Sequence, residues 1–239
     1  MVDGALSTRV TGSKPRLAGL LAEHFTVYRY DRRGRGDSGD TQPYAVKREI
    51  EDLDVLIEKA GGSALVYGHS SGGCLALDAA AELSDKVRKL AIYEPPYNDD
   101  PKARAAWTVY IKNLSDTLAD DRRGDAVALF LASEGTPAAE IEAMRQQPFW
   151  AGMEGLATTL AHDHMGVIGS DCGIPTDRAR RLRVPTLVMA GGASYPFMLQ
   201  TATTLSKAIP DAKLSTLDGQ GHVVDPESLA PLLVEFFAN

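Results

Sequence analysis

The sequence predicts an α/β protein with a mostly parallel, doubly wound sheet and an inserted helical cap. Apolar runs typical of buried strands alternate with segments of helical periodicity, which is the pattern of a parallel sheet covered by helices. This alternation lapses over residues 98–183, where several helical patterns occur without a convincing strand pattern. We therefore expect a core formed by residues 1–97 and 184–239, with residues 98–183 inserted as the cap.

In the first part of the core, helices and strands alternate along the chain. Leu17, Leu20 and Leu21 share one face of a predicted helix, and Gly61 and Gly62 end another. The expected elements are a helix over 15–24, a strand over 25–30, a loop rich in glycine and charge over 31–39, a helix over 46–60, a strand over 64–67, a helix over 74–81 and a strand over 87–93.

The remaining elements follow from the same patterns. The last helix has a clear start, because Asp225 can cap it and Pro226 suits its first position. Within and after the insertion we expect helices over 105–120, 126–133 and 138–146, a strand over 185–190, a helix over 196–209, a strand over 212–217 and a helix over 226–237.

The composition favours a protein that acts on small molecules. The 32 acidic residues exceed the 25 basic ones, which gives a formal charge of -7 and no large positive field for nucleic acid. The two cysteines, Cys74 and Cys172, do not indicate a disulfide, and this fits a reducing compartment. Because no apolar run approaches the roughly 20 residues that span a bilayer and the N-terminus has no signal pattern, we expect a cytoplasmic location without membrane contact. The sequence does not indicate the oligomeric state.

Ser70 is the candidate nucleophile. It lies in the Gly-His-Ser-Ser-Gly stretch of residues 68–72, directly after the apolar run 64–67 and directly before the small-residue helix 74–81. A strand, a sharp turn and a helix in this order form a nucleophile elbow, which lifts the serine hydroxyl above the sheet. Glycines flank such a serine because the strand and helix backbones crowd together there.

Three motifs occur in a fixed order along the chain. Residues 31–38 read D-x-R-G-x-G-x-S, residues 68–72 form the elbow, and Gly221 and His222 follow the last predicted strand. With these motifs the chain resembles the α/β-hydrolase superfamily, and specifically its cap-bearing serine hydrolases, over nearly its whole length. The resemblance implies an α/β-hydrolase fold, with strands before Asp3 that the sequence does not supply. We therefore expect the sheet to lack its first strands.

The resemblance assigns His222 as the general base, since a serine hydroxyl needs a nearby base to take its proton. Many relatives carry an acid after the seventh strand, but residues 189–195 offer no carboxylate. Glu94 ends the strand after the elbow, where some superfamily members place the acid instead. We expect Glu94 to orient His222 and to stabilise the imidazolium, with Asp218 and Asp171 as alternatives.

The same resemblance implies two backbone amides that hold a developing oxyanion. Ser71, the residue after the nucleophile, supplies one of them. The second belongs to a segment that often reads H-G-x in relatives, and residues 3–7 resemble it with aspartate in place of histidine. We expect the amide of Ala5 to be the second donor, with Leu6 as the neighbouring alternative.

Other side chains have both structural and functional interpretations. His162, Asp163 and His164 are competent metal ligands, but alternate residues diverge on a helix and no second cluster accompanies them. We therefore expect no metal there and favour their interpretation as cap residues that face the pocket. The arginines of residues 31–38 favour a structural ion pair or a solvated surface over an anion site. Large side chains in and near the insertion suit an apolar substrate pocket or core packing equally, and these are Trp107, Phe149, Trp150, Met153, Met165 and Phe197.

Together these residues predict a cofactor-free serine hydrolase that acts on a small, apolar ester, thioester or lactone through an acyl-enzyme at Ser70. A serine at the elbow disfavours haloalkane dehalogenase and epoxide hydrolase chemistry, for which relatives use an aspartate there. The missing acid in residues 189–195 and the aspartate at position 3 would suit a non-catalytic ligand-binding module or an inactive relative. The same three side chains would also serve a carbon–carbon bond hydrolase or a hydroxynitrile lyase.

Overall fold

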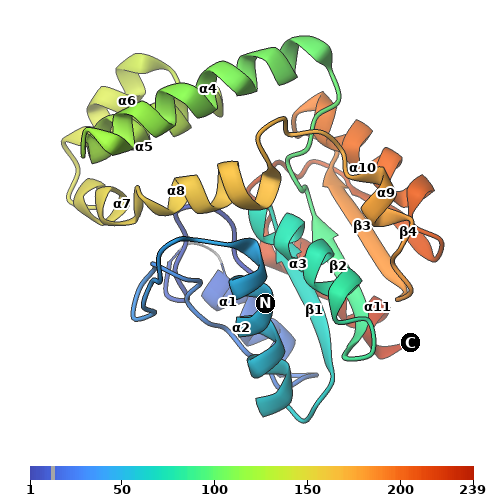
Figure 1. Cartoon of the computed structure of the whole chain (residues 1–239). Helices are drawn as coiled ribbons and strands as arrows, with labels where there is room; N and C mark the ends of the chain where they lie inside the picture. The colour runs from blue at the N-terminus through green and yellow to red at the C-terminus, as the bar shows by residue number, and fades with distance from the viewer. Residues whose placement is uncertain (12–13) are drawn as a thin grey trace.

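The core of the protein is a parallel sheet with helices on both faces (Figure 1). The computed structural model describes residues 1–11 and 14–239. Within these residues the sheet has the strand order β1-β2-β3-β4, and every neighbouring pair is parallel. The predicted α/β class is therefore confirmed. The strands are β1 (Ala64–His69), β2 (Val87–Tyr93), β3 (Thr186–Gly191) and β4 (Ala212–Leu217).

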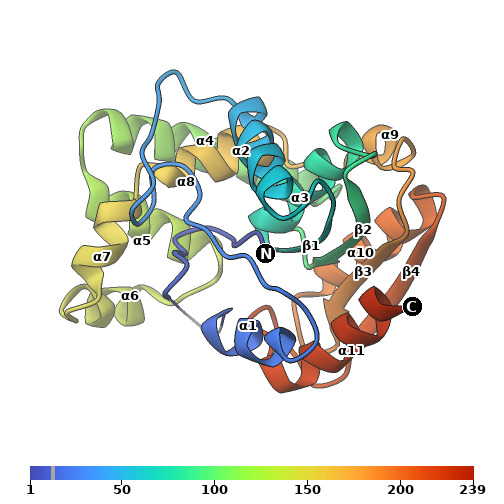
Figure 2. The ribbon, with the colours of Figure 1, turned by 90° about the horizontal axis from the view of Figure 1, so that it is seen from below.

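Two hydrophobic layers form because successive side chains of a strand point to opposite faces of the sheet. Val66 belongs to the cluster on one face, which includes side chains of α2, α3 and α10, and Tyr67 belongs to the cluster on the other face, which includes side chains of α1 and α11. Figure 2 shows α1 and α11 side by side beneath the sheet. These core helices are α1 (Lys14–Ala22), α2 (Val46–Lys59), α3 (Ser71–Glu82), α10 (Pro196–Ala208) and α11 (Pro226–Ala238).

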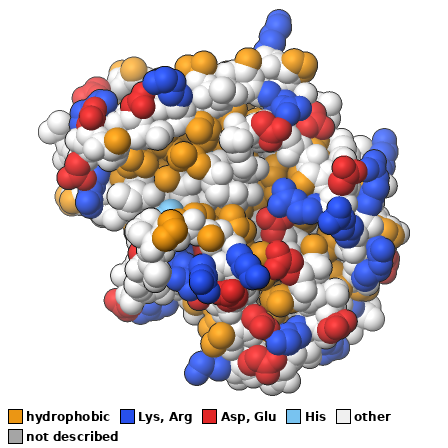
Figure 3. Space-filling view, viewed as in Figure 1, with side chains coloured by type: hydrophobic (Ala, Val, Ile, Leu, Met, Phe, Trp, Pro, Cys, Tyr) orange, Lys and Arg blue, Asp and Glu red, His pale blue; other side chains and the backbone are white. Residues whose placement is uncertain are grey.

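Residues 98–183 contain the helices α4 to α9 and η1, and α4 to α8 form a layer above the sheet, to which the name cap refers below (Figure 1). A separate hydrophobic cluster that includes Leu114, Val127 and Leu160 holds this layer together. Figure 3 shows hydrophobic side chains gathered between α4 and α8. Among the described residues, no helix combines the length and the apolar character needed to cross a bilayer. The helices are α4 (Pro101–Ala119), α5 (Arg123–Ser133), α6 (Ala138–Arg145), α7 (Trp150–Leu156), α8 (Thr159–Ala161), the π-helix η1 (His162–Ile168) and α9 (Thr176–Ala179).

The structure differs from the prediction at residues 25–30, which do not form a strand. A strand requires a hydrogen-bonded neighbour, and within the described residues the outer edge of β1 pairs only with Val2. The Val2 amide donates to the Tyr67 carbonyl (2.8 Å), and the His69 amide donates to the Val2 carbonyl (3.1 Å). A cavity of about 450 Å³ is lined by β1 and by residues 25–30. The sequence of this segment favours β structure, but it has no sheet partner.

The other predicted strands and helices are present, with ends that shift by a few residues. Four short helical elements have no counterpart in the prediction, namely α7, α8, η1 and α9. Helix α3 is buried along most of its length, because its small side chains let it lie close to β1 and β2. Its Cys74 is a free thiol, as is Cys172, and both side chains are buried.

The burial of α3 gives a stability prediction. Leu75 is fully buried between the helix and the sheet, whereas Leu199 on α10 is 39% exposed. We expect Leu75→Ala to lower the free energy of unfolding by about 2 to 5 kcal/mol, because the substitution removes buried methyl groups and leaves a cavity. The matched variant Leu199→Ala should cost less than about 1 kcal/mol. Urea unfolding of both variants checks this, and equal losses would contradict the assigned core.

Candidate active site

The turn between β1 and α3 presents Ser70 above the sheet. Ser70 has φ 56° and ψ -131°, a conformation that is strained for a residue with a side chain. Its amide donates to the Tyr93 carbonyl (2.9 Å), and its carbonyl accepts from the Gly73 amide (2.8 Å), so both neighbouring elements hold it. Gly68 is required because a methyl group there would overlap Gly72 and Ala76 across the turn. This local geometry is that of a nucleophile elbow.

The imidazole of His222 lies between Ser70 and Glu94. Its Nε2 is 3.1 Å from the Ser70 hydroxyl oxygen, and its Nδ1 is 2.7 Å from Glu94 Oε2. A carboxylate only accepts, so Nδ1 carries the proton and Nε2 is free to accept from the hydroxyl. The structure thus brings together three side chains that lie up to 152 positions apart in the chain.

Glu94 is held by the last residue of β3 and by the loop that follows β3. It has φ 47° at the end of β2, and its side chain is fully buried. Its carboxylate accepts from the Gly191 amide (2.7 Å) and from the Ser194 hydroxyl (2.9 Å) in addition to His222. Ser194 belongs to residues 189–195, which offer no carboxylate, and its hydroxyl donates to Glu94 instead.

The two alternative acids do not contact His222. Asp171 forms an exposed ion pair with Arg104 (2.5 Å) at the surface. Asp218 is exposed after β4 and has no described hydrogen bond to the imidazole. Of the three carboxylates considered from the sequence, the structure places Glu94 against His222.

The two candidate oxyanion donors flank Ser70. Ser71 is the first residue of α3, where helix amides have no partner within the helix and the dipole favours negative charge. Gly4 packs against the elbow, since a methyl group on it would lie 2.9 Å from Ser70 Cβ and 3.5 Å from Ser70 Oγ. This close approach brings the following residue, Ala5, to the same cavity as Ser70 and Ser71.

A small cavity of about 210 Å³ opens at Ser70 between the core and the cap. Trp107 lines it. The other large side chains that the sequence suggested for a substrate pocket do not line this cavity. Trp150 and Met153 pack in the cluster inside the cap, Met165 is 41% exposed, Phe149 is 52% exposed, and Phe197 packs beside Tyr195.

Several residues that line the cavity were not predicted. Periodicity shows which helix face is apolar, but it does not show which cap helix turns toward Ser70, so the sequence gives no signal for these positions. They are Ser7, Lys14, His69, Pro96, Phe130, Glu134, Ile168 and Val223.

Burial keeps two histidines of the site neutral. His69 donates from Nε2 to the His222 carbonyl (2.9 Å) and so holds the loop that carries His222. Burial lowers the pKa of His69 well below its usual value, and the nearby Lys14 and His222 act in the same direction. Burial also lowers the pKa of His164 to about 4, and its Nδ1 accepts from the Tyr110 hydroxyl (2.7 Å). Burial raises the pKa of Glu134, which lines the same cavity.

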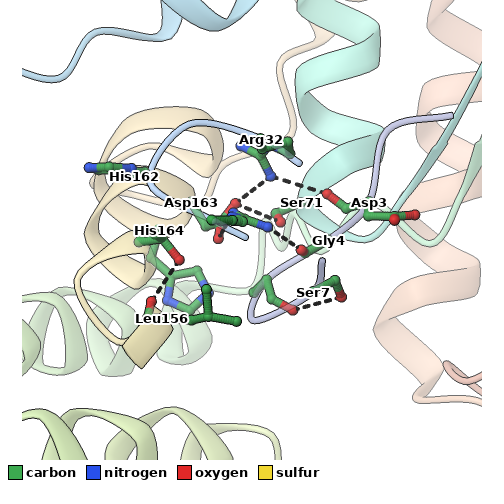
Figure 4. A network of polar contacts seen from close by, with 12 residues as sticks. Asp3, Gly4, Ser7, Arg32, Ser71, Leu156, His162, Asp163 and His164 are labelled. Atoms are coloured by element: carbon green, nitrogen blue, oxygen red, sulfur yellow. Dashed lines mark hydrogen bonds and ion pairs between the residues drawn. The ribbon is translucent and has the colours of Figure 1, made fainter. Parts of the chain in front are cut away.

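The His-Asp-His stretch of residues 162–164 does not gather around a common point. His162 stacks on Tyr44 with ring centroids 4.0 Å apart, His164 faces Tyr110, and Asp163 forms buried ion pairs with Arg32 and Arg35 (Figure 4). In residues 1–11 and 14–239, no group of three or more His, Cys, Asp or Glu side chains is arranged to hold a metal ion.

The arginines of residues 31–38 form ion pairs, which is the structural interpretation of the motif. Arg32 and Arg35 are fully buried against Asp163, and Arg33 pairs with Asp52 (2.6 Å) at the surface of α2.

Comparisons with known proteins agree with this fold. A family model described as "Alpha/beta hydrolase family" matches residues 9–232. The crystal structure of an alpha/beta hydrolase from Sphaerobacter thermophilus is 50% identical in sequence and superposes with a TM-score of 0.85, covering 99% of this chain and 90% of that chain. The protein named "Putative carbamate hydrolase RutD" from Azorhizobium caulinodans is 26% identical over 237 residues, which span 93% of this chain and 84% of that protein. The enol-lactonase from Burkholderia xenovorans shares the fold, with 21% identity, a TM-score of 0.69 and coverage of 100% of this chain and 90% of its own.

The depressed pKa of His164 gives a pH prediction. The unfolded chain binds a proton at His164 near the usual value of 6.5, whereas the folded protein binds it only near about 4. The contribution of His164 to stability is therefore complete above pH 6.5 and is lost as the pH falls toward 4. We expect the loss to be about 3 kcal/mol in size.

Urea unfolding between pH 7 and 4 measures this dependence. In His164→Gln the free energy of unfolding should fall less steeply over that range than in the unchanged protein. His24→Gln, which replaces an exposed histidine, is the matched control and should keep the original slope. Identical slopes for all three proteins would show that His164 is protonated normally in the fold.

Proposed function

Because the chain belongs to the alpha/beta hydrolase family, we propose that it is a serine hydrolase that forms an acyl-enzyme at Ser70. The proposal rests on the His222 imidazole, which lies within hydrogen-bond distance of both the Ser70 hydroxyl and the Glu94 carboxylate. A base that contacts the nucleophile, and that is itself oriented by a third group, is the arrangement that activates a serine.

In the proposed reaction the Ser70 oxygen attacks the substrate carbonyl while His222 Nε2 takes the hydroxyl proton. Glu94 keeps the other nitrogen protonated and stabilises the imidazolium that results. The carbonyl oxygen becomes negative and accepts hydrogen bonds from the amides of Ser71 and Ala5. When the tetrahedral intermediate collapses, the imidazolium gives its proton to the leaving group. A water molecule then attacks the acyl group on Ser70 by the same steps, which releases the acid. Side chains and amides of the chain perform every step, so the proposed mechanism uses no cofactor.

The size of the cavity favours a small substrate. At about 210 Å³ it suits a molecule of roughly ten heavy atoms rather than a long acyl chain or a polymer. Trp107, Phe130 and Ile168 provide apolar walls, so we propose small esters, thioesters and lactones as the substrate class. The name of the Azorhizobium relative adds carbamates to the compounds that should be tested.

Reaction with a fluorophosphonate probe tests the nucleophile. The probe should add one covalent label at Ser70, because phosphonylation requires an activated serine hydroxyl. Intact mass spectrometry should show no label on Ser70→Ala and full label on Ser206→Ala, in which a serine of α10 outside the site is replaced. If well-folded protein with Ser70 intact is never labelled, the non-catalytic alternative is favoured.

The role of Glu94 is tested by Glu94→Gln. The amide is nearly the same size but cannot hold the correct imidazole tautomer or balance the imidazolium charge, so kcat on an activated ester such as p-nitrophenyl acetate should fall by about 10⁴. Glu51→Gln changes a residue of α2 outside the site whose side chain is 44% exposed, and this matched control should retain the original kcat. A rate near normal in Glu94→Gln would move the orienting acid to another residue.

A further inference from the structure

Asp163 connects the cap to the residue that follows the nucleophile (Figure 4). It lies on η1 and its side chain is fully buried. Its Oδ1 accepts from the Ser71 hydroxyl (2.9 Å) and from Arg32 Nη1 (2.7 Å), and its Oδ2 accepts from Arg35 Nη2 (2.6 Å). One carboxylate of the cap therefore contacts the first residue of α3 and both buried arginines of residues 31–38.

The two arginines continue to the segment that carries the other candidate donor. Arg32 donates to the carbonyl oxygen of Asp3 (3.2 Å), and Arg35 donates to the carbonyl oxygen of Gly4. Figure 4 shows Gly4 and the contact of Arg32 with Asp3 beside the Asp163 carboxylate. In a trans peptide the carbonyl and the amide point in opposite directions. A fixed Gly4 carbonyl therefore also fixes the direction of the Ala5 amide, which points away from the guanidinium.

Charge balance stabilises the cluster. Arg32 also makes a two-point ion pair with Glu49 (2.8 and 2.6 Å), so two cations and two carboxylates are buried together. Burial opposes the ionisation of Asp163, but the charges of Arg35 and Arg32 outweigh it and hold the pKa of Asp163 well below its usual value. Breaking such a cluster would leave an uncompensated buried charge, so its partners do not exchange freely.

We propose that Asp163 and Arg35 are positioning residues that hold the Ser71 and Ala5 amides in the direction of the oxyanion formed at Ser70. Asp163 acts through the Ser71 hydroxyl, and Arg35 acts through the Gly4 carbonyl. This inference rests on the proposed serine hydrolase function and extends it, because it makes the oxyanion geometry depend on η1 of the cap. Amide donors that already point at the oxyanion position stabilise the transition state more than the bound substrate. Loss of their orientation therefore lowers kcat more than it changes KM.

Three variants test the proposal. Arg35→Gln removes the contact with the Gly4 carbonyl, and Ser71→Ala removes only the hydroxyl contact with Asp163 while the buried charges stay paired. Arg33→Gln is the matched control, because Arg33 lies in the same loop but pairs with Asp52 rather than with Asp163. The kcat and KM for p-nitrophenyl acetate are measured per active site titrated with a fluorophosphonate. The Ki of a simple alkylboronic acid, which forms a tetrahedral anion on Ser70, is measured in parallel.

We expect kcat to fall by about 100-fold in Arg35→Gln and by about 10-fold in Ser71→Ala, with KM within about 3-fold of the original value. The boronate Ki should rise in proportion to the fall in kcat, and Arg33→Gln should stay within about 2-fold in all three constants. A purely structural role would lower the fraction of titratable sites and leave kcat per site unchanged. If kcat per site and the boronate Ki are unchanged in both Arg35→Gln and Ser71→Ala, the proposal is wrong.

Crystal structures of Arg35→Gln and Arg33→Gln separate this proposal from the proposed function. We expect the Gly4–Ala5 peptide to rotate in Arg35→Gln and to stay in place in Arg33→Gln. If the unchanged protein is never labelled by the fluorophosphonate, the hydrolase function fails and the positioning of an oxyanion fails with it. If the protein is labelled and active but the peptide and kcat are unchanged in Arg35→Gln, only the positioning role fails.

Discussion

A buried carboxylate at the end of β2 determines how the ends of the strands meet. Glu94 is fully buried, and an ionised group in that position would be very unfavourable without hydrogen-bond donors. Its three donors are the Gly191 amide, the Ser194 hydroxyl and His222 Nδ1, which come from the last residue of β3, the loop after β3 and the loop after β4. The hydrogen bonds that this one carboxylate accepts therefore join the ends of β2, β3 and β4. They also hold the His222 imidazole within hydrogen-bond distance of Ser70.

Ser70 is supported from two sides by different buried charges. On the side of the sheet, Glu94 holds His222, and His69 donates to the carbonyl of the same loop. On the side of the cap, Asp163 holds Ser71 and connects to the arginines of residues 31–38. The strained backbone of Ser70 persists because contacts on both sides determine it.

The site residues that could be predicted from the sequence are those that a local sequence pattern identifies. The elbow is read from a strand, a glycine-flanked serine and a helix, and His222 from its position after the last strand. The role of residues 25–30 depends on a neighbouring strand rather than on their own β-forming side chains, so the local pattern gave the wrong element. Trp150 and Met153 are large apolar side chains of the kind that line pockets. In the folded cap they pack in its own hydrophobic cluster instead. The contact between Asp163 and Ser71 spans 92 positions and depends on how η1 packs on α3, which no local pattern encodes.

The cap has two parts that are held in physically different ways. Helices α4 to α7 pack around their own hydrophobic cluster, and nondirectional apolar contacts of this kind tolerate changes of side chain when volume is kept. The π-helix η1 is held by directional bonds from Asp163 to charged and hydroxyl donors of the core, which tolerate almost no change of chemistry. The cavity takes Trp107 and Phe130 from α4 and α5, and His164 and Ile168 from η1. Substitutions on α4 and α5 can therefore reshape the cavity while the contacts of Asp163 with Ser71 and the two buried arginines stay in place.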